Sequence, residues 1–98
     1  LAQRQLKAIS DPTRYKIIGQ LATRPHYVQE LADILGLTTA TLSHHLGHLQ
    51  QVMLVGVSIE GRRSYYKLNS DELLELSKVL NNIAERSKRG DNYGKQED

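Results

Sequence analysis

Hydrophobic residues spaced three or four positions apart predict helices along most of the chain. This spacing predicts helices over residues 1–9, 12–23 and 27–35. A fourth helix is expected to begin after Thr38, and a fifth covers residues 70–86. The 98 residues are therefore expected to form one mainly helical domain.

Capping residues mark the boundaries of these helices. Asp11 can accept hydrogen bonds from free backbone N–H groups, and Pro12 suits the first position of the second helix. Gly36 is a typical end for the third helix, and Thr38 can cap the fourth only two residues later. Two short helices joined by so short a turn predict a helix-turn-helix.

A β-hairpin is predicted after the fourth helix. Residues 55–59 alternate and are rich in β-branched side chains, residues 60–62 can turn, and residues 63–68 can return. On the returning strand we expect Tyr66 to face the core and Tyr65 to face the other side. The predicted fold class is mainly α with a small β-hairpin wing, a winged helix-turn-helix of about five helices.

The last predicted helix carries an apolar seam that needs a second helix to cover it. Its members fall at helical spacing, and they are Leu73, Leu76, Val79, Leu80 and Ile83. We expect residues 1–89 to form the winged helix-turn-helix DNA-binding and dimerisation domain. Residues 90–98 are polar and are predicted to be a disordered tail.

Composition excludes several classes of site. The absence of cysteine excludes disulfides, thiolate metal sites and cysteine nucleophiles. No apolar run is long enough to span a membrane and the start of the chain has no signal-peptide core, so a cytoplasmic protein with no membrane partner is expected. No phosphate-binding loop, paired acids or Ser/His/Asp motif is present, so we predict no catalytic residues, no enzyme activity and no cofactor.

The predicted fourth helix carries side chains suited to reading DNA. Residues 34–59 contain no Lys, Arg, Asp or Glu, so base contacts must come from hydroxyl, methyl, imidazole and amide groups. The arginines of the hairpin can reach phosphates or the minor groove. Because the reading helix has no fixed positive charge, a shallow salt dependence of binding is expected. The candidate DNA-binding residues are Thr38, Thr39, Ala40, Thr41, Ser43, His44, His48, Arg62 and Arg63.

The histidines are the candidate metal ligands of this cysteine-free chain. His44 and His48 lie four apart on one helical face, a spacing that can bind zinc, but two ligands do not complete a site. His45 lies nearer the apolar stripe and is expected to be partly buried, and His26 is expected near the start of the third helix. No metal site is therefore predicted.

Three segments together resemble the ArsR/SmtB family of winged-helix repressors. They are SDPTRYKIIGQL, VQELADILGLTTATLSHHLGHLQQVMLV and EGRRSYYKLN, and the likeness covers about residues 6–76. The resemblance implies five helices with a two-stranded wing and a homodimer built from the first and last helices. Operator binding that represses transcription until a signal is sensed is implied as well. The implied dimer interface comprises Leu6, Ile9, Leu73, Leu76, Val79, Leu80 and Ile83.

The familiar metal sensors of that family have no counterpart here. Cysteines at the start of the third helix are replaced by RPHYVQELA, and the last helix carries no histidine. A site formed by His26 with a carboxylate of a second copy stays open. The sequence does not identify the inducer.

The leading hypothesis is a dimeric repressor that places residues 39–48 of each subunit in successive major grooves of double-stranded DNA, on an inverted-repeat operator. One alternative is a winged-helix protein-interaction or dimerisation module within a larger regulator, which the uncharged reading helix favours and the wing arginines oppose. A metal-sensing repressor is the third.

Overall fold

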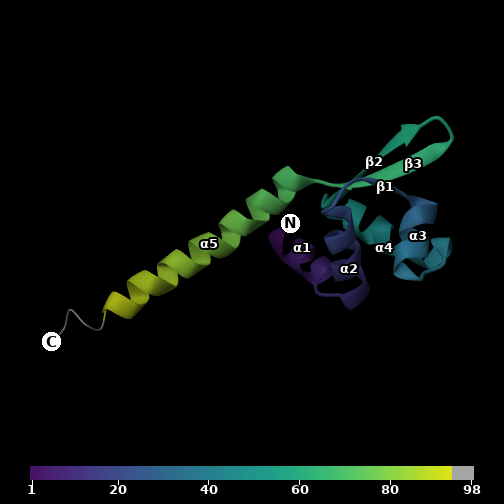
Figure 1. Cartoon of the computed structure of the whole chain (residues 1–98). Coiled ribbons are helices and arrows are strands. Elements are labelled where there is room, and N and C mark those ends of the chain that lie inside the picture. The colour runs from purple at the N-terminus through teal and green to yellow at the C-terminus, as the bar shows by residue number, and fades with distance from the viewer. Residues whose placement is uncertain (94–98) are drawn as a thin grey trace.

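The computed structural model describes residues 1–93 and combines five helices with one small sheet. Four helices and the sheet form a body from which the fifth helix projects (Figure 1), so the molecule measures 67 × 23 × 21 Å. This arrangement confirms the predicted fold class. The helices are α1 (Ala2–Ile9), α2 (Pro12–Leu21), α3 (Val28–Leu35), α4 (Thr39–Gln51) and α5 (Ser70–Tyr93), and the strands are β1 (His26–Tyr27), β2 (Val55–Glu60) and β3 (Arg63–Leu68).

The predicted capping residues set the helix boundaries. The Asp11 carboxylate accepts a hydrogen bond from the backbone N–H of Arg14 at 2.9 Å, at the start of α2. Gly36 ends α3 with φ +67°, a left-handed conformation that costs glycine little because it has no Cβ. Thr38 then caps α4. The turn between the two helices is therefore as short as the sequence predicts.

The core lies where α2, α3 and α4 meet. Its largest fully buried side chains are aliphatic except for one histidine, and burial of each such aliphatic side chain contributes about 1.5–3 kcal/mol. Tyr66 and Leu68 pack against this core from β3, which confirms the predicted orientation of Tyr66. The fully buried side chains are Ile17, Leu31, Leu42, Leu46, Leu49, Leu54 and His26.

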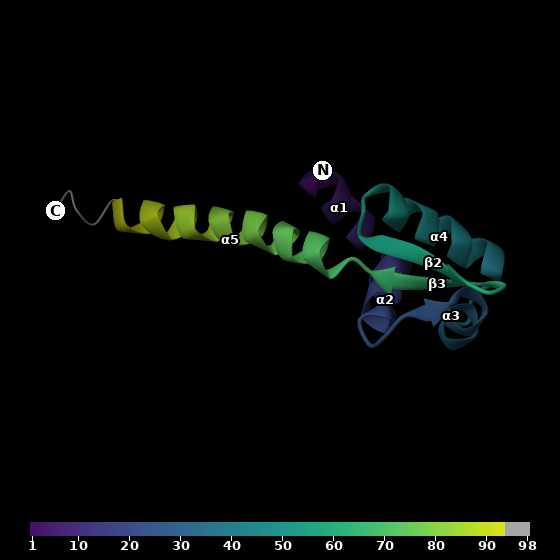
Figure 2. The same ribbon diagram turned by 90° about the horizontal axis from the view of Figure 1, so that it is seen from above.

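The sheet contains a strand that the sequence analysis missed. The strand order is β1-β3-β2, all antiparallel, and β1 pairs His26 with Tyr66 and Tyr27 with Tyr65. Two residues are too few to show an alternating pattern, so only pairing with β3 defines this strand. The expected two-stranded wing is thus the outer part of a three-stranded sheet, in which β2 lies beside α4 and β3 beside α3 (Figure 2).

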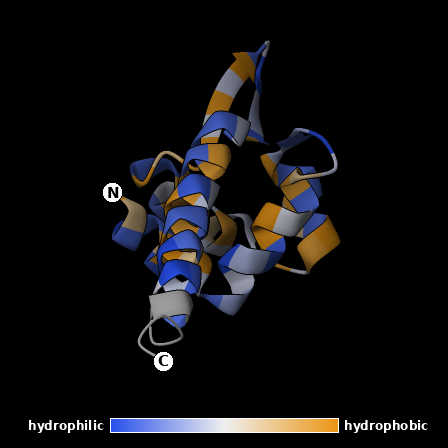
Figure 3. Cartoon of the chain, turned by 90° about the vertical axis from the view of Figure 1, so that its left-hand side faces the viewer, coloured by the Kyte–Doolittle hydropathy of each residue, from blue (hydrophilic) through white to orange (hydrophobic). Residues whose placement is uncertain are grey.

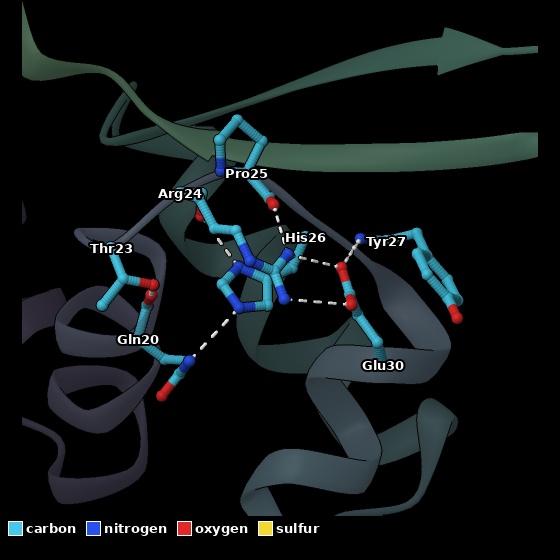
Figure 4. Close-up of polar contacts among 7 residues, drawn as sticks. All are labelled: Gln20, Thr23, Arg24, Pro25, His26, Tyr27 and Glu30. Atoms are coloured by element: carbon cyan, nitrogen blue, oxygen red, sulfur yellow. Dashed lines mark hydrogen bonds and ion pairs between the residues drawn. The ribbon is translucent and has the colours of Figure 1, made fainter.

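His26 joins α2 to the start of α3. Its side chain is 0% exposed, its Nδ1 donates to the carbonyl of Arg24 at 2.8 Å, and its Nε2 lies 3.2 Å from Nε2 of Gln20 (Figure 4). Both nitrogens are engaged and no surface is exposed, so in this structure His26 offers no free nitrogen to a metal shared with a carboxylate of a second copy.

α5 is longer than the sequence predicts. The helix continues through Tyr93, so the expected disordered tail is wrong for residues 90–93, and residues 94–98 lie outside the described part of the chain. Once a helix is started, each further residue adds a hydrogen bond without a new nucleation cost, and no apolar pattern is needed. Residues 85–89 include good helix formers. Within them, Nζ of Lys88 lies 3.8 Å from a carboxylate oxygen of Glu85, one turn earlier in the helix. Across residues 1–93 no helix is both long and apolar enough to cross a membrane.

The buried position of His26 predicts a large stability effect. His26→Ala should lower the free energy of unfolding by about 2–3 kcal/mol, because it leaves a cavity and removes both hydrogen bonds. The exposed His48 is the matched control. His48→Ala should change the free energy of unfolding by less than about 0.5 kcal/mol. Urea denaturation measures both, and equal losses would contradict the structural role of His26.

Candidate nucleic-acid interface

The outer face of α4 presents the predicted reading residues to solvent. Leu42, Leu46 and Leu49 are fully buried on the inner face, and this fixes which residues point outward. Thr39, Ala40, Thr41, Ser43, His44 and His48 are all exposed, as is the capping Thr38. The structure thus brings together every α4 residue that the sequence assigned to DNA. Their contact with DNA stays a prediction.

Thr38 and Thr41, at the start of α4, differ in the hydrogen bonds that their hydroxyl groups can still make. The hydroxyl of Thr38 accepts from the backbone N–H of Thr41 at 3.1 Å and lies 3.0 Å from the Thr41 hydroxyl, to which it donates. Thr38 is therefore occupied by capping. Thr41 keeps its own hydroxyl proton for a further acceptor, and Thr39 and Ala40 carry free methyl groups beside it.

His44 and His48 contact each other across one helical turn. Their Nε2 atoms are 3.3 Å apart and their rings meet edge to face with centroids 4.7 Å apart. In residues 1–93 no group of three or more His, Cys, Asp or Glu side chains is placed to hold a metal ion.

His45 anchors α4 to the first two helices. Its Nδ1 lies 3.4 Å from Nη1 of Arg14 and 3.9 Å from a carboxylate oxygen of Asp11, and its side chain is only 16% exposed, in line with the predicted partial burial. Arg14 in turn donates from Nε to the carbonyl of Ala8 at 2.7 Å. The backbone N–H of Arg14 lowers the pKa of the Asp11 carboxyl below its ordinary value, although partial desolvation opposes the shift. These contacts set the angle between α4 and the α1–α2 corner.

The two wing arginines lie in different surroundings. Arg62 is exposed in the turn, next to Gly61 with φ +64°. The guanidinium carbon of Arg63 lies 4.4 Å from the centre of the Tyr27 ring, a cation–π contact on the outer face of the sheet. Tyr65 completes this cluster, with its ring edge-to-face on Tyr27 at 5.9 Å. Of the two, Arg62 has the more freedom to reach a backbone phosphate.

An ion pair fixes the first helix of the helix-turn-helix. Arg24 contacts both carboxylate oxygens of Glu30, at 2.9 and 3.2 Å, and Glu30 also accepts from the backbone N–H of Tyr27 at 3.1 Å (Figure 4). The Arg24 hydrogen bond, followed by the Tyr27 N–H, lowers the pKa of the Glu30 carboxyl. Sequence reasoning missed this pair, because six positions separate its members and only the turn at Pro25 brings them together.

The proposed dimer surface is divided between exposed and covered residues. Leu6 is 39% exposed, and Val79, Leu80 and Ile83 are 41–50% exposed on α5. Figure 3 looks along α5 and shows hydrophobic segments of this helix alternating with hydrophilic ones. Leu76 is only 5% exposed within its own chain, where the base of α5 packs beside α1, so little of its surface is left for a second copy and its place in the interface stays a prediction. Ile9 and Leu73 also pack on the core of their own chain.

Residues 11–55 match the family described as bacterial regulatory protein, arsR family. The chain is 34% identical over 87 residues to the transcriptional repressor SdpR of Bacillus subtilis, and this match covers 88% of the chain and 92% of SdpR. The chain belongs to the arsR family of bacterial regulatory proteins. It is also 39% identical over 67 residues to the HTH-type transcriptional regulator CmtR of Mycobacterium tuberculosis, but spans only 57% of CmtR.

Solved structures of arsR-like proteins share the fold of this family member. An ArsR-like transcriptional regulator from Rhodococcus sp. RHA1 superposes with a TM-score of 0.89 at 27% identity, over 97% of this chain and 90% of its own. The domain Mb0332 from Mycobacterium bovis superposes with a TM-score of 0.70 at 27% identity, over 85% of this chain and 77% of its own. It is described as a homodimeric winged helix-turn-helix DNA-binding domain. The winged helix-turn-helix predicted from the sequence is confirmed.

The lowered pKa of Glu30 predicts a pH-dependent contribution to the stability of this arsR-family domain. The ionised carboxylate stabilises the fold above its unfolded-state pKa near 4.5, and this contribution is lost as the pH falls through the lower folded-state value. Glu30→Gln should therefore lower the melting temperature at pH 7, and the two proteins should converge near pH 3. The control Glu75→Gln removes an exposed ion pair with Lys78 and should change the melting temperature little. A constant difference from pH 7 to pH 3 would contradict the assignment.

Proposed function

We propose that this arsR-family chain is a dimeric transcriptional repressor that binds an inverted repeat in double-stranded DNA. The observation that carries the proposal is the outer face of α4, where hydroxyl, methyl and imidazole groups lie together in solvent. A helix of this kind fits the major groove, and these groups match the donors, acceptors and thymine methyls presented there. The similarity to SdpR, a transcriptional repressor, supports the same conclusion.

In this proposal Ser43 and His44 read base edges from the middle of the exposed face. Thr39, Ala40 and Thr41 contact thymine methyls or phosphates at its start. Arg62 binds the backbone or enters the minor groove from the wing. The core leucines hold α4 rigidly, so the reading groups are positioned before DNA arrives.

In the proposed dimer, the exposed apolar face of α5 is the main contact surface. The face that packs Leu76 against the body continues outward through Val79, Leu80 and Ile83 without a cover in the single chain. A second copy of this chain, with its α5 and α1, supplies that cover, in keeping with the homodimeric description of Mb0332. Two α4 helices about 34 Å apart then read successive major grooves on one side of the duplex. A regulator of this kind acts in the cytoplasm, on chromosomal DNA.

A random duplex pool tests the proposal directly. Selection with the dimer, followed by fluorescence anisotropy on the enriched sequences, should recover an inverted repeat bound with nanomolar affinity. An unrelated duplex of the same length measures the non-specific background. No enrichment would overturn the proposal and favour the protein-interaction module, for which the uncharged α4 face is the supporting observation.

The division of roles between α4 and the wing predicts two distinct effects. Ser43→Ala should relax preference at one base position per half-site and cost about 1–3 kcal/mol on the selected sequence. Arg62→Ala should weaken selected and unrelated duplexes by the same factor. Anisotropy titrations on both duplexes give these values. Sequence-dependent loss for Arg62→Ala, or uniform loss for Ser43→Ala, would contradict the assignment.

The exposed seam of α5 predicts how the dimer can be broken. Ile83→Asp should give a folded monomer in sedimentation equilibrium, since it places a charge in an apolar interface. Asn81→Asp adds the same charge on another side of the helix, and it should leave the dimer intact. Dissociation by both variants, or by neither, would show that the dimer forms elsewhere.

A further inference from the structure

A basic cleft lies between α1 and the C-terminal half of α4. It has a volume of about 330 Å³ and a floor formed by Ala8 and Val52. Three cationic side chains line it, Arg4 and Lys7 from α1 and Arg14 from α2, and His48 and Gln51 of α4 complete the wall. No local pattern predicts this grouping, because 41 or more positions separate the α1 cations from the α4 residues.

The cations of the cleft differ in how much of their charge is available. Arg14 is held by the Ala8 carbonyl and lies beside Asp11, which offsets its charge. Arg4 and Lys7 are exposed, and within residues 1–93 no carboxylate forms an ion pair with either. These two side chains therefore make the cleft positively charged.

The cleft is continuous with the outer face of α4. His48 and Gln51 line it, and the same two residues also line the shallow hollow formed with Ser43, His44 and Gly47. A duplex that receives this face of α4 in its major groove has a phosphate backbone on each side of the helix. The cations of α1 lie on one of these sides.

The proposed dimer leaves the basic side of α1 free. At about 100° per residue, Arg4 and Lys7 lie on one side of the buried Gln5–Ala8 face, and Leu6 and Ile9 lie on the other. A partner that covers Leu6 therefore need not cover the two cations. One side of α1 can therefore contact the second copy in the dimer, while the other side lines the cleft.

We propose that this cleft binds backbone phosphates of the DNA strand that borders the major groove read by α4. The proposal rests on the DNA-binding function proposed above and assigns the backbone contact to Arg4 and Lys7. Each phosphate neutralised adds about 0.9 to the slope of log affinity against log salt, so four such cations in a dimer add about 3 to 4. This replaces the shallow salt dependence expected from the uncharged reading helix.

The test is a salt titration of Arg4→Ala/Lys7→Ala on a selected duplex and on an unrelated one. We expect the slope to fall by about 3 to 4 for both duplexes, with at least tenfold weaker binding at 0.15 M salt and unchanged base preference. Lys78→Ala/Lys88→Ala removes the same number of charges from α5 and should leave the slope unchanged. The charge-conserving Arg4→Lys/Lys7→Arg should retain the full slope. Circular dichroism and sedimentation establish that each variant is a folded dimer.

Each other outcome overturns a distinct part of the argument. A wild-type protein that binds neither duplex at low salt overturns the proposed function and the cleft with it. Wild-type binding with an unchanged slope in Arg4→Ala/Lys7→Ala overturns the cleft alone. A separate experiment without DNA uses inorganic phosphate as the ligand, and ³¹P NMR measures its binding to the protein. Saturable phosphate binding that the double variant abolishes, with no change in the DNA slope, would assign the cleft to a small free anion.

Discussion

The burial of the leucine stripe on α4 is the constraint on which the rest of the structure depends. Leu42, Leu46 and Leu49 leave solvent completely, and their removal from water fixes the rotation of α4 about its own axis. Only one rotation satisfies all three, and it turns the hydroxyl and imidazole groups outward together. The proposed DNA interface is therefore the face of α4 opposite the core, and a change in core packing would reorient the residues proposed to read bases.

Side chains around α4 divide into those that hold the fold and those that stay available. Thr38 caps, His45 joins α4 to Arg14, and Arg63 stacks on Tyr27. Ser43 and Arg62 have exposed polar groups with no such structural partner among the hydrogen bonds and ion pairs of residues 1–93. Identical residue types thus serve different purposes a few positions apart, and the difference comes from what each can reach in the folded chain.

In the proposed complex, base reading and charge belong to different elements. α4 carries no fixed charge, whereas the cations that surround it come from α1, α2 and the turn of the wing. Uncharged groups discriminate between bases by hydrogen-bond pattern, while cations bind every phosphate alike. Placing the two on different elements lets overall affinity change without altering the base preference of α4.

Local signals were strong enough for the sequence to determine the helices, their capping residues, the short turn at Gly36 and the hairpin. These features depend on residues within one or two turns of each other, so periodicity and capping chemistry reveal them. The exposed face of α4 follows for the same reason, because the leucine spacing defines its inner side.

Only the tertiary structure decided the features that need residues distant in sequence. β1 exists because β3 pairs with it, His26 is buried because Gln20 and Arg24 satisfy its ring, and Leu76 is covered at the base of α5 beside α1. The basic cleft arises in the same way, because cations of α1 and α2 meet α4 residues that lie 34 or more positions later in the sequence. Each feature depends on contacts between segments that are distant in the sequence, and these contacts form only when the chain folds. Local sequence patterns do not predict them.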